Sequence, residues 1–125
     1  MTYQWIDKAT GLGYIAVRGQ MLRFIEFLDT IDALTASPEW RPGTPVIEDL
    51  RDYHGCCPPN CVEEWRRYVG DRQRVLHGCR WAIVRREDEP HLLSVLDTAA
   101  ADAEAHGVVL RQFSNMIDAH VWTLP

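Results

Sequence analysis

The chain has 125 residues, of which 46% are hydrophobic and 25% are charged, and its formal net charge is −5. This length is typical of one domain, residues 1–125, which can fold without disulfides or metal. The negative charge argues against a general nucleic-acid binder, since affinity for phosphate backbones comes mainly from Lys and Arg. No apolar run approaches the roughly 18 residues of a membrane helix, and residues 1–5 do not resemble a signal peptide. We therefore expect a cytoplasmic protein with reduced cysteines.

The first third of the chain predicts a hairpin followed by a helix. Residues 3–7 and 12–18 have the pattern of two strands, and Lys8-Ala9-Thr10-Gly11 between them has the composition of a turn. Apolar residues then recur at helical spacing over residues 21–31. This spacing predicts an amphipathic helix of about four turns. The helix should end by Ser37-Pro38, because proline disfavours helical geometry in the residue before it.

A buried central strand and a cysteine-rich loop come next. The apolar run within residues 44–52 predicts the strand, and residues 54–61 form the loop after it. Asn60 and Glu63 have the spacing of a capping box, which predicts a helix over residues 61–70. In open α/β sheets, ligands usually bind at the carboxyl ends of strands. This loop is therefore the first candidate for a binding site.

The rest of the chain continues the alternation of strands and helices. Residues 80–84 and 108–113 predict strands, Pro90 opens a helix that Gly107 ends, and a last helix covers residues 115–122. The predicted order is β-β-α-β-α-β-α-β-α. Such alternation implies right-handed crossovers and a mixed, largely parallel sheet of about five strands, with the opening hairpin as its antiparallel edge.

Four stretches of the sequence carry a resemblance to a known family. They are residues 14–19, 37–51, 80–84 and 113–122, and together they resemble the bacterial STAS-like proteins, small relatives of anti-sigma-factor antagonists. The resemblance covers most of the chain, and its motifs are structural: a turn and strand edges. It implies an α/β fold with helices mainly on one face of the sheet. It also implies a module that binds proteins or small apolar ligands without performing chemistry.

The chain departs from the antagonists at their phosphorylation site. In those proteins a serine at the start of the helix after the central strand is phosphorylated by a partner kinase. This chain has no serine between Ser37 and Ser94, and the only threonine in that interval is Thr44, ahead of the strand. The phosphorylation switch is therefore missing. The cysteine-rich loop has no counterpart in the family pattern either.

The cysteine-rich loop offers ligands for a metal. Thiolate sulfur and imidazole nitrogen suit zinc, which takes four ligands in a tetrahedron. The side chains with this chemistry are those of His54, Cys56, Cys57, Cys61 and Cys79. Their spacing differs from the usual two distant pairs, so a zinc site would need residue 79 to fold back beside the loop.

A redox site would use the same thiols differently. At the first turn of its helix, Cys61 would have a lowered pKa because the helix dipole favours the thiolate, and Cys56 or Cys57 would be its partner. The C-x₃-C spacing is not that of disulfide oxidoreductases, and Pro58-Pro59 stiffens the loop. Unreactive buried thiols are the simpler alternative.

An enzyme is not predicted. Glu48, Asp49 and Asp52 would form a carboxylate pair only on a shared face, yet Glu48 and Asp49 should point to opposite sides of their strand. None of the five histidines lies beside a recognisable nucleophile motif.

Two further features suggest ligands. A small apolar or lipid-like ligand would lie between the first helix and the sheet, and a preformed cavity on the order of a few hundred Å³ would support this reading. The candidate ligand-binding residues are Phe24, Phe27, Leu28, Trp40, Asp52 and Tyr53, with Trp40 the tryptophan expected to be most exposed. Seven arginines between residues 66 and 86 would either contact an anionic partner, including a phospholipid head group, or pair with neighbouring acids on a solvated face.

These observations lead to one interpretation and two alternatives. We interpret the chain as a non-enzymatic STAS-like binding or regulatory module that docks to a protein partner or forms a homodimer. The first alternative is a carrier or sensor of a small apolar ligand. The second is a metal or thiol sensor built on the cysteine-rich loop. No cofactor is expected unless zinc binds that loop.

Overall fold

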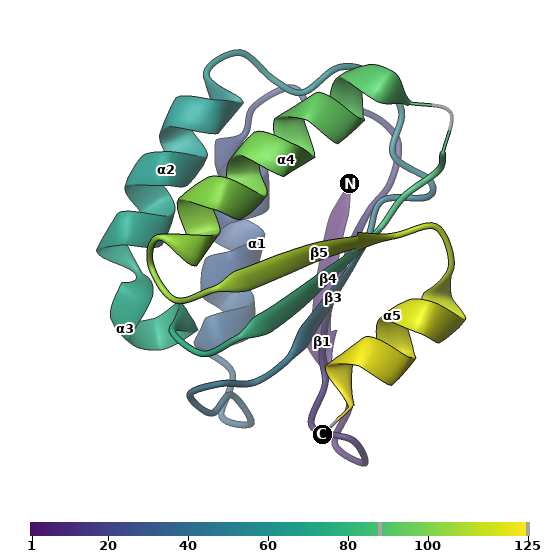
Figure 1. The fold of residues 1–125 in the computed structure, drawn as a ribbon. Helices are drawn as coiled ribbons and strands as arrows, with labels where there is room; N and C mark the ends of the chain where they lie inside the picture. The colour runs from purple at the N-terminus through teal and green to yellow at the C-terminus, as the bar shows by residue number, and fades with distance from the viewer. Residues whose placement is uncertain (88, 125) are drawn as a thin grey trace.

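A computed structural model describes residues 1–87 and 89–124. Its strands are β1 (Thr2–Ile6), β2 (Gly13–Val17), β3 (Val46–Asp49), β4 (Arg80–Val84) and β5 (Val109–Phe113). Its helices are α1 (Ile25–Thr35), α2 (Cys61–Asp71), α3 (Gln73–Leu76), α4 (Pro90–Glu104) and α5 (Met116–Thr123). The strands form one sheet in the order β1-β2-β3-β4-β5. Figure 1 labels β5, β4, β3 and β1 across this sheet.

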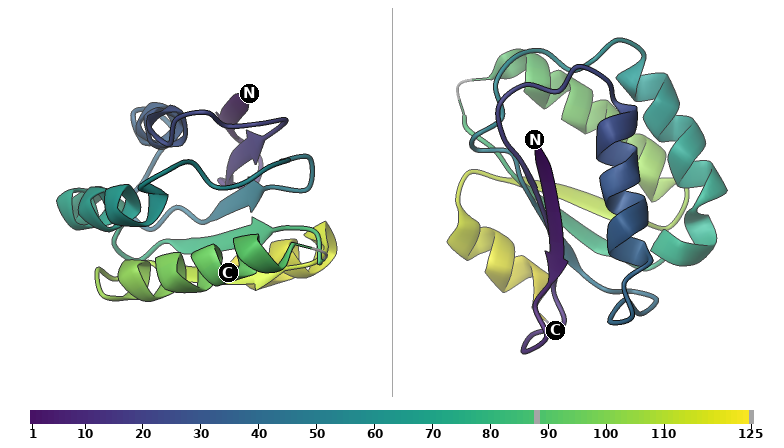
Figure 2. Two further views of the ribbon diagram at one scale, coloured as in Figure 1. Left: turned by 90° about the horizontal axis from the view of Figure 1, so that it is seen from above. Right: turned by 180° about the vertical axis from the view of Figure 1, so that it is seen from behind.

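The sheet topology explains where the helices lie. β1 pairs antiparallel with β2, and the other neighbouring pairs are parallel. Each parallel connection moves one strand in the same direction along the sheet, so right-handed crossovers place α1, α2 and α4 on one face. α5 follows the last strand and covers part of the opposite face (Figure 2). The predicted fold is confirmed in element order, in its largely parallel sheet and in having its helices mainly on one face.

The central strands are buried on both faces. On β3, Val46 belongs to the core beneath α1, α2 and α4, and Ile47 belongs to the smaller core beneath α5. On β4, Trp81 and Ala82 divide between the two faces in the same way. A strand covered on both sides needs apolar residues in succession, which is why both strands appeared in the sequence as short continuous apolar runs.

Apart from shifts of one residue at the ends of several elements, three predictions about individual elements differ from the structure. The first helix begins at Ile25, so Met21 and Phe24 precede its first turn. Asn60 has a φ of 64° and makes no side-chain capping bond, so the predicted capping box is wrong. This left-handed backbone geometry follows the two prolines of the loop and makes the turn into α2. The short helix α3 was not predicted.

Candidate functional site

Two loops meet at the carboxyl ends of the parallel strands. The backbone N–H of Gly19, after β2, donates to the carbonyl of Asp52, and the N–H of His54 donates to the carbonyl of Gly19, at 2.9 and 2.7 Å. The Tyr53 hydroxyl donates to the carbonyl of Cys56 at 2.8 Å. These bonds hold the loop after β3 against the segment that leads to α1, and they position the cysteine-rich loop over the sheet.

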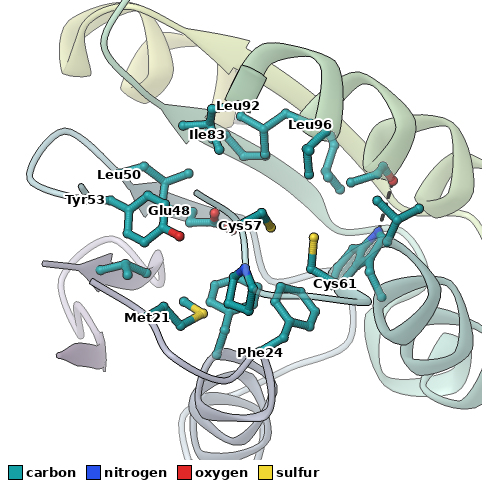
Figure 3. Close-up of a pocket in the computed structure, with 18 residues that line it drawn as sticks. Met21, Phe24, Glu48, Leu50, Tyr53, Cys57, Cys61, Ile83, Leu92 and Leu96 are labelled. Atoms are coloured by element: carbon teal, nitrogen blue, oxygen red, sulfur yellow. Dashed lines mark hydrogen bonds between the residues drawn. The ribbon is translucent and has the colours of Figure 1, made fainter. Parts of the chain in front are cut away.

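Beneath this loop lies an apolar cavity between the sheet and helices α1, α2 and α4 (Figure 3). Its volume is about 70 Å³, several times the roughly 10–15 Å³ that one water molecule needs. Including the part open to solvent, the empty space is about 650 Å³. The wall consists of Val17, Met21, Phe24, Phe27, Glu48, Leu50, Tyr53, Cys57, Pro58, Cys61, Val62, Trp65, Ile83, Leu92, Val95, Leu96, Ala99 and Leu110.

Glu48 is the one charged side chain among the described residues of the wall. It lies on the middle strand and is only 5% exposed. The indole Nε1 of Trp81 donates to its Oε1 at 2.9 Å. Burial raises the pKa of this carboxyl to about 7, and the hydrogen bond from Trp81 opposes that rise in part. The group can therefore gain or lose its proton near neutral pH.

Two cysteines lie side by side in the wall. The thiols of Cys57, in the loop, and Cys61, at the start of α2, form a hydrogen bond, and Figure 3 shows their sulfur atoms next to each other. Burial raises the pKa of the Cys57 thiol, and the hydrogen bond with Cys61 raises it further. The two thiols are therefore close enough to form a redox pair. A redox site also needs a thiolate, and Cys57 is not an activated nucleophile because its pKa is raised.

The predicted metal ligands do not come together. Cys79 is fully buried, and its thiol accepts a backbone hydrogen bond from Gly43, away from the cysteine-rich loop. His54 and Cys56 are exposed, and the His54 ring contacts Arg86. Across residues 1–87 and 89–124, no group of three or more His, Cys, Asp or Glu side chains is arranged to hold a metal ion. The zinc site that residues 54, 56, 57, 61 and 79 offered as an alternative is therefore not assembled among the described residues.

The thiols should react with very different rates. Cys56 is exposed, whereas Cys61 and Cys79 are buried and Cys57 is half-buried. We expect Ellman's reagent at pH 7.5 to modify one thiol rapidly in the native protein and four after unfolding. Cys56→Ser should abolish the rapid phase, and Cys79→Ser should leave it intact. A rapid phase that survives Cys56→Ser would show a reactive thiol in the cavity and contradict this assignment.

Half of the predicted ligand-binding residues line the cavity. Phe24, Phe27 and Tyr53 belong to its wall. Leu28 is buried in the core outside the wall. The structure does not place the remaining two at the cavity: Trp40 is half-buried and packs against the core, and Asp52 is exposed. The expectation of an exposed Trp40 is wrong because the chain after α1 folds this ring back onto the core.

Sequence reasoning did not assign Glu48 and the α4 side of the cavity to the binding site. The opposed directions of Glu48 and Asp49 were expected, and the structure confirms them: Glu48 is buried, whereas Asp49 pairs with Arg51 at 2.9 Å. The signal that marks Glu48 was an acid inside a strand that is buried on both faces. No comparable signal in the sequence indicates that Leu92 and Leu96 line the same cavity as Glu48.

The arginines mostly have partners from other segments of the chain. Arg66 pairs with Asp102 at 3.1 Å, and Arg72 pairs with Asp32 at 3.2 Å. Both arginines pair with acids, as expected, but not with the neighbouring acids that were predicted: Asp102 and Asp32 lie on other helices.

No family model matches the chain, and no curated protein matches it. Among solved structures, the chain is similar to an uncharacterised protein of the DUF3478 family from Shewanella loihica PV-4, described as having a SpoIIAA-like fold. The TM-score is 0.62 at 12% identity, over 98% of this chain and 93% of that chain. This protein therefore has a SpoIIAA-like, or STAS-like, α/β fold, as the resemblance implied.

In the part of the chain that the structure describes, the helices are all too short or too polar to cross a membrane.

Proposed function

We propose that the protein is a non-enzymatic binding module for a small apolar ligand. The observation that carries this proposal is the apolar cavity of about 70 Å³ beneath the cysteine-rich loop. Close-packed protein interiors leave few voids larger than a water molecule. A cavity at the carboxyl ends of parallel strands, open to solvent and walled by aliphatic and aromatic side chains, fits ligand binding better than it fits a structural defect.

The size of the cavity limits the ligand. It is smaller than the few hundred Å³ that would suit a lipid-like molecule without rearrangement. This volume suits a short alkyl chain, so a molecule with about four carbon atoms is the probe to use. Burying each of its methylene groups would contribute about 0.8 kcal/mol to binding. Docking to a protein partner and formation of a homodimer stay predictions.

The test is a titration with 1-butanol, followed by two-dimensional NMR. We expect saturable shifts confined to backbone amides around the cavity. Ala99 faces the cavity from α4, so Ala99→Leu should fill it and weaken binding at least tenfold. Ala101→Leu is the matched control on the same helix, since Ala101 is exposed. Absence of saturable shifts in the wild-type protein, or equal binding by both variants, would contradict the proposal.

A further inference from the structure

The cavity wall has few polar groups left to offer a ligand. The indole Nε1 of Trp65 donates to the carbonyl of Ala99 at 3.0 Å, and that of Trp81 donates to Glu48. The Tyr53 hydroxyl donates to a carbonyl of its own loop. The strong side-chain donors around the cavity are therefore already used. A carboxylate or phosphate entering the cavity would find no positive charge among the described wall residues and would face Glu48.

Glu48 is the exception to this pattern. Among the described residues, Trp81 donates to its Oε1, and no hydrogen bond reaches the second carboxyl oxygen. This oxygen is not fully buried: among the described residues, the fully buried side-chain oxygen without a hydrogen-bond partner is Oδ2 of Asp102. The Glu48 oxygen is an acceptor at the edge of the cavity. A carboxyl in this apolar setting costs stability, so its place on the central strand needs another reason.

The other side chains of the cavity suit a cation. Four aromatic rings line it, those of Phe24, Phe27, Tyr53 and Trp65. The faces of such rings attract positive charge, most strongly where water is excluded. The acceptor oxygen, the aromatic wall and the absence of cationic wall residues all favour a ligand that is apolar and carries a positively charged donor.

We infer that the cavity selects a small apolar amine, whose ammonium group donates a hydrogen bond to the free carboxyl oxygen of Glu48. This inference rests on the proposed function and assigns the chemical class of its ligand. No covalent step is involved: the ammonium and the carboxylate form an ion pair, and the alkyl group occupies the apolar space.

The test compares three probes that share one alkyl chain: n-butylamine, 1-butanol and butyrate. At pH 8.5, NMR titration of the wild-type protein should show butylamine binding at least tenfold more tightly than butanol, and butyrate binding most weakly. Glu48→Gln keeps the size of the side chain and an acceptor for Trp81 but removes the charge. It should reduce butylamine affinity to the level at which the same variant binds butanol.

The pH dependence supplies a second test that requires no change at Glu48. Butylamine should bind about tenfold more weakly at pH 6 than at pH 8.5, because the carboxyl is protonated below its pKa of about 7. Among the described residues, the other titratable groups facing the cavity are those of Tyr53 and Cys57 in the loop and Cys61 on α2, and α1, α4 and the strands besides β3 contribute none. Cys61→Ser should therefore show the same pH dependence.

The outcomes separate the two proposals. If butanol does not bind, the proposed function fails. If butanol binds and butylamine binds no more tightly, the cavity is a binding site but the amine inference is wrong. Equal butylamine binding by the wild-type protein and Glu48→Gln, or butyrate binding as tight as that of butylamine, would also overturn it.

Discussion

Between pH 4.5 and pH 8.5, the wild-type protein is expected to lose about 3 kcal/mol of unfolding free energy relative to Glu48→Gln. The reason is the pKa of Glu48, which burial raises from 4.5 in the unfolded chain to about 7 in the folded protein. Between these values the folded state holds a proton that the unfolded state has released. Stability from this proton is complete below pH 4.5 and is lost as pH rises through 7. Urea unfolding of both proteins across this range measures the difference.

The next residue on the strand supplies a control of opposite sign. Burial would raise the pKa of Asp49, but hydrogen bonds from Arg51 lower it overall. A lowered pKa gives stability that is present above the unfolded value of 3.8 and is lost as pH falls further. Asp49→Asn should therefore leave the difference between pH 4.5 and pH 8.5 almost unchanged. Equal pH profiles for the wild-type protein and Glu48→Gln would show that the carboxyl is not buried as described.

The fold could be predicted from the sequence because its signals are local. Hydrophobic spacing separates α2 from β3 and β4, and the alternation of elements then leaves few topologies that obey right-handed crossover. Reliance on local hydrophobic spacing also explains why α1 was predicted to begin too early. Met21 and Phe24 extend the helical spacing backwards, yet they are apolar because they face the cavity and not because they are helical.

The site could be predicted only where its residues are close together in the sequence. The loop after β3 was identified because ligands bind at strand ends, and Cys57, Cys61 and Tyr53 do lie in the cavity wall. The partner of Glu48 depends instead on register. Trp81 lies opposite Val46, two residues from Glu48 on the neighbouring strand, and this offset brings the indole to the carboxyl diagonally. Register between β3 and β4 is set by packing that no single segment encodes.

Trp81→Ala is expected to have the largest effect of a single substitution on stability, a loss of about 3–5 kcal/mol at pH 6. The indole is fully buried on β4 and packs edge-on against Trp65, with ring centroids 6.4 Å apart. Truncation removes this packing and leaves a cavity beside the one already present. The same substitution takes away the donor to Glu48. Denaturant unfolding measures the loss, and a cost below 1 kcal/mol would contradict the described core.

Trp81→Phe separates the hydrogen bond from the packing, since it keeps a large ring and removes the N–H. Without this donor, the pKa of Glu48 should rise above 7, because the bond from Trp81 is what lowers it. The pH at which stability is lost should therefore shift upward. Trp65→Phe is the matched control: its indole donates to a backbone carbonyl, so the midpoint should not move. In Trp81→Phe combined with Glu48→Gln the transition should vanish, and its persistence would assign it to another group.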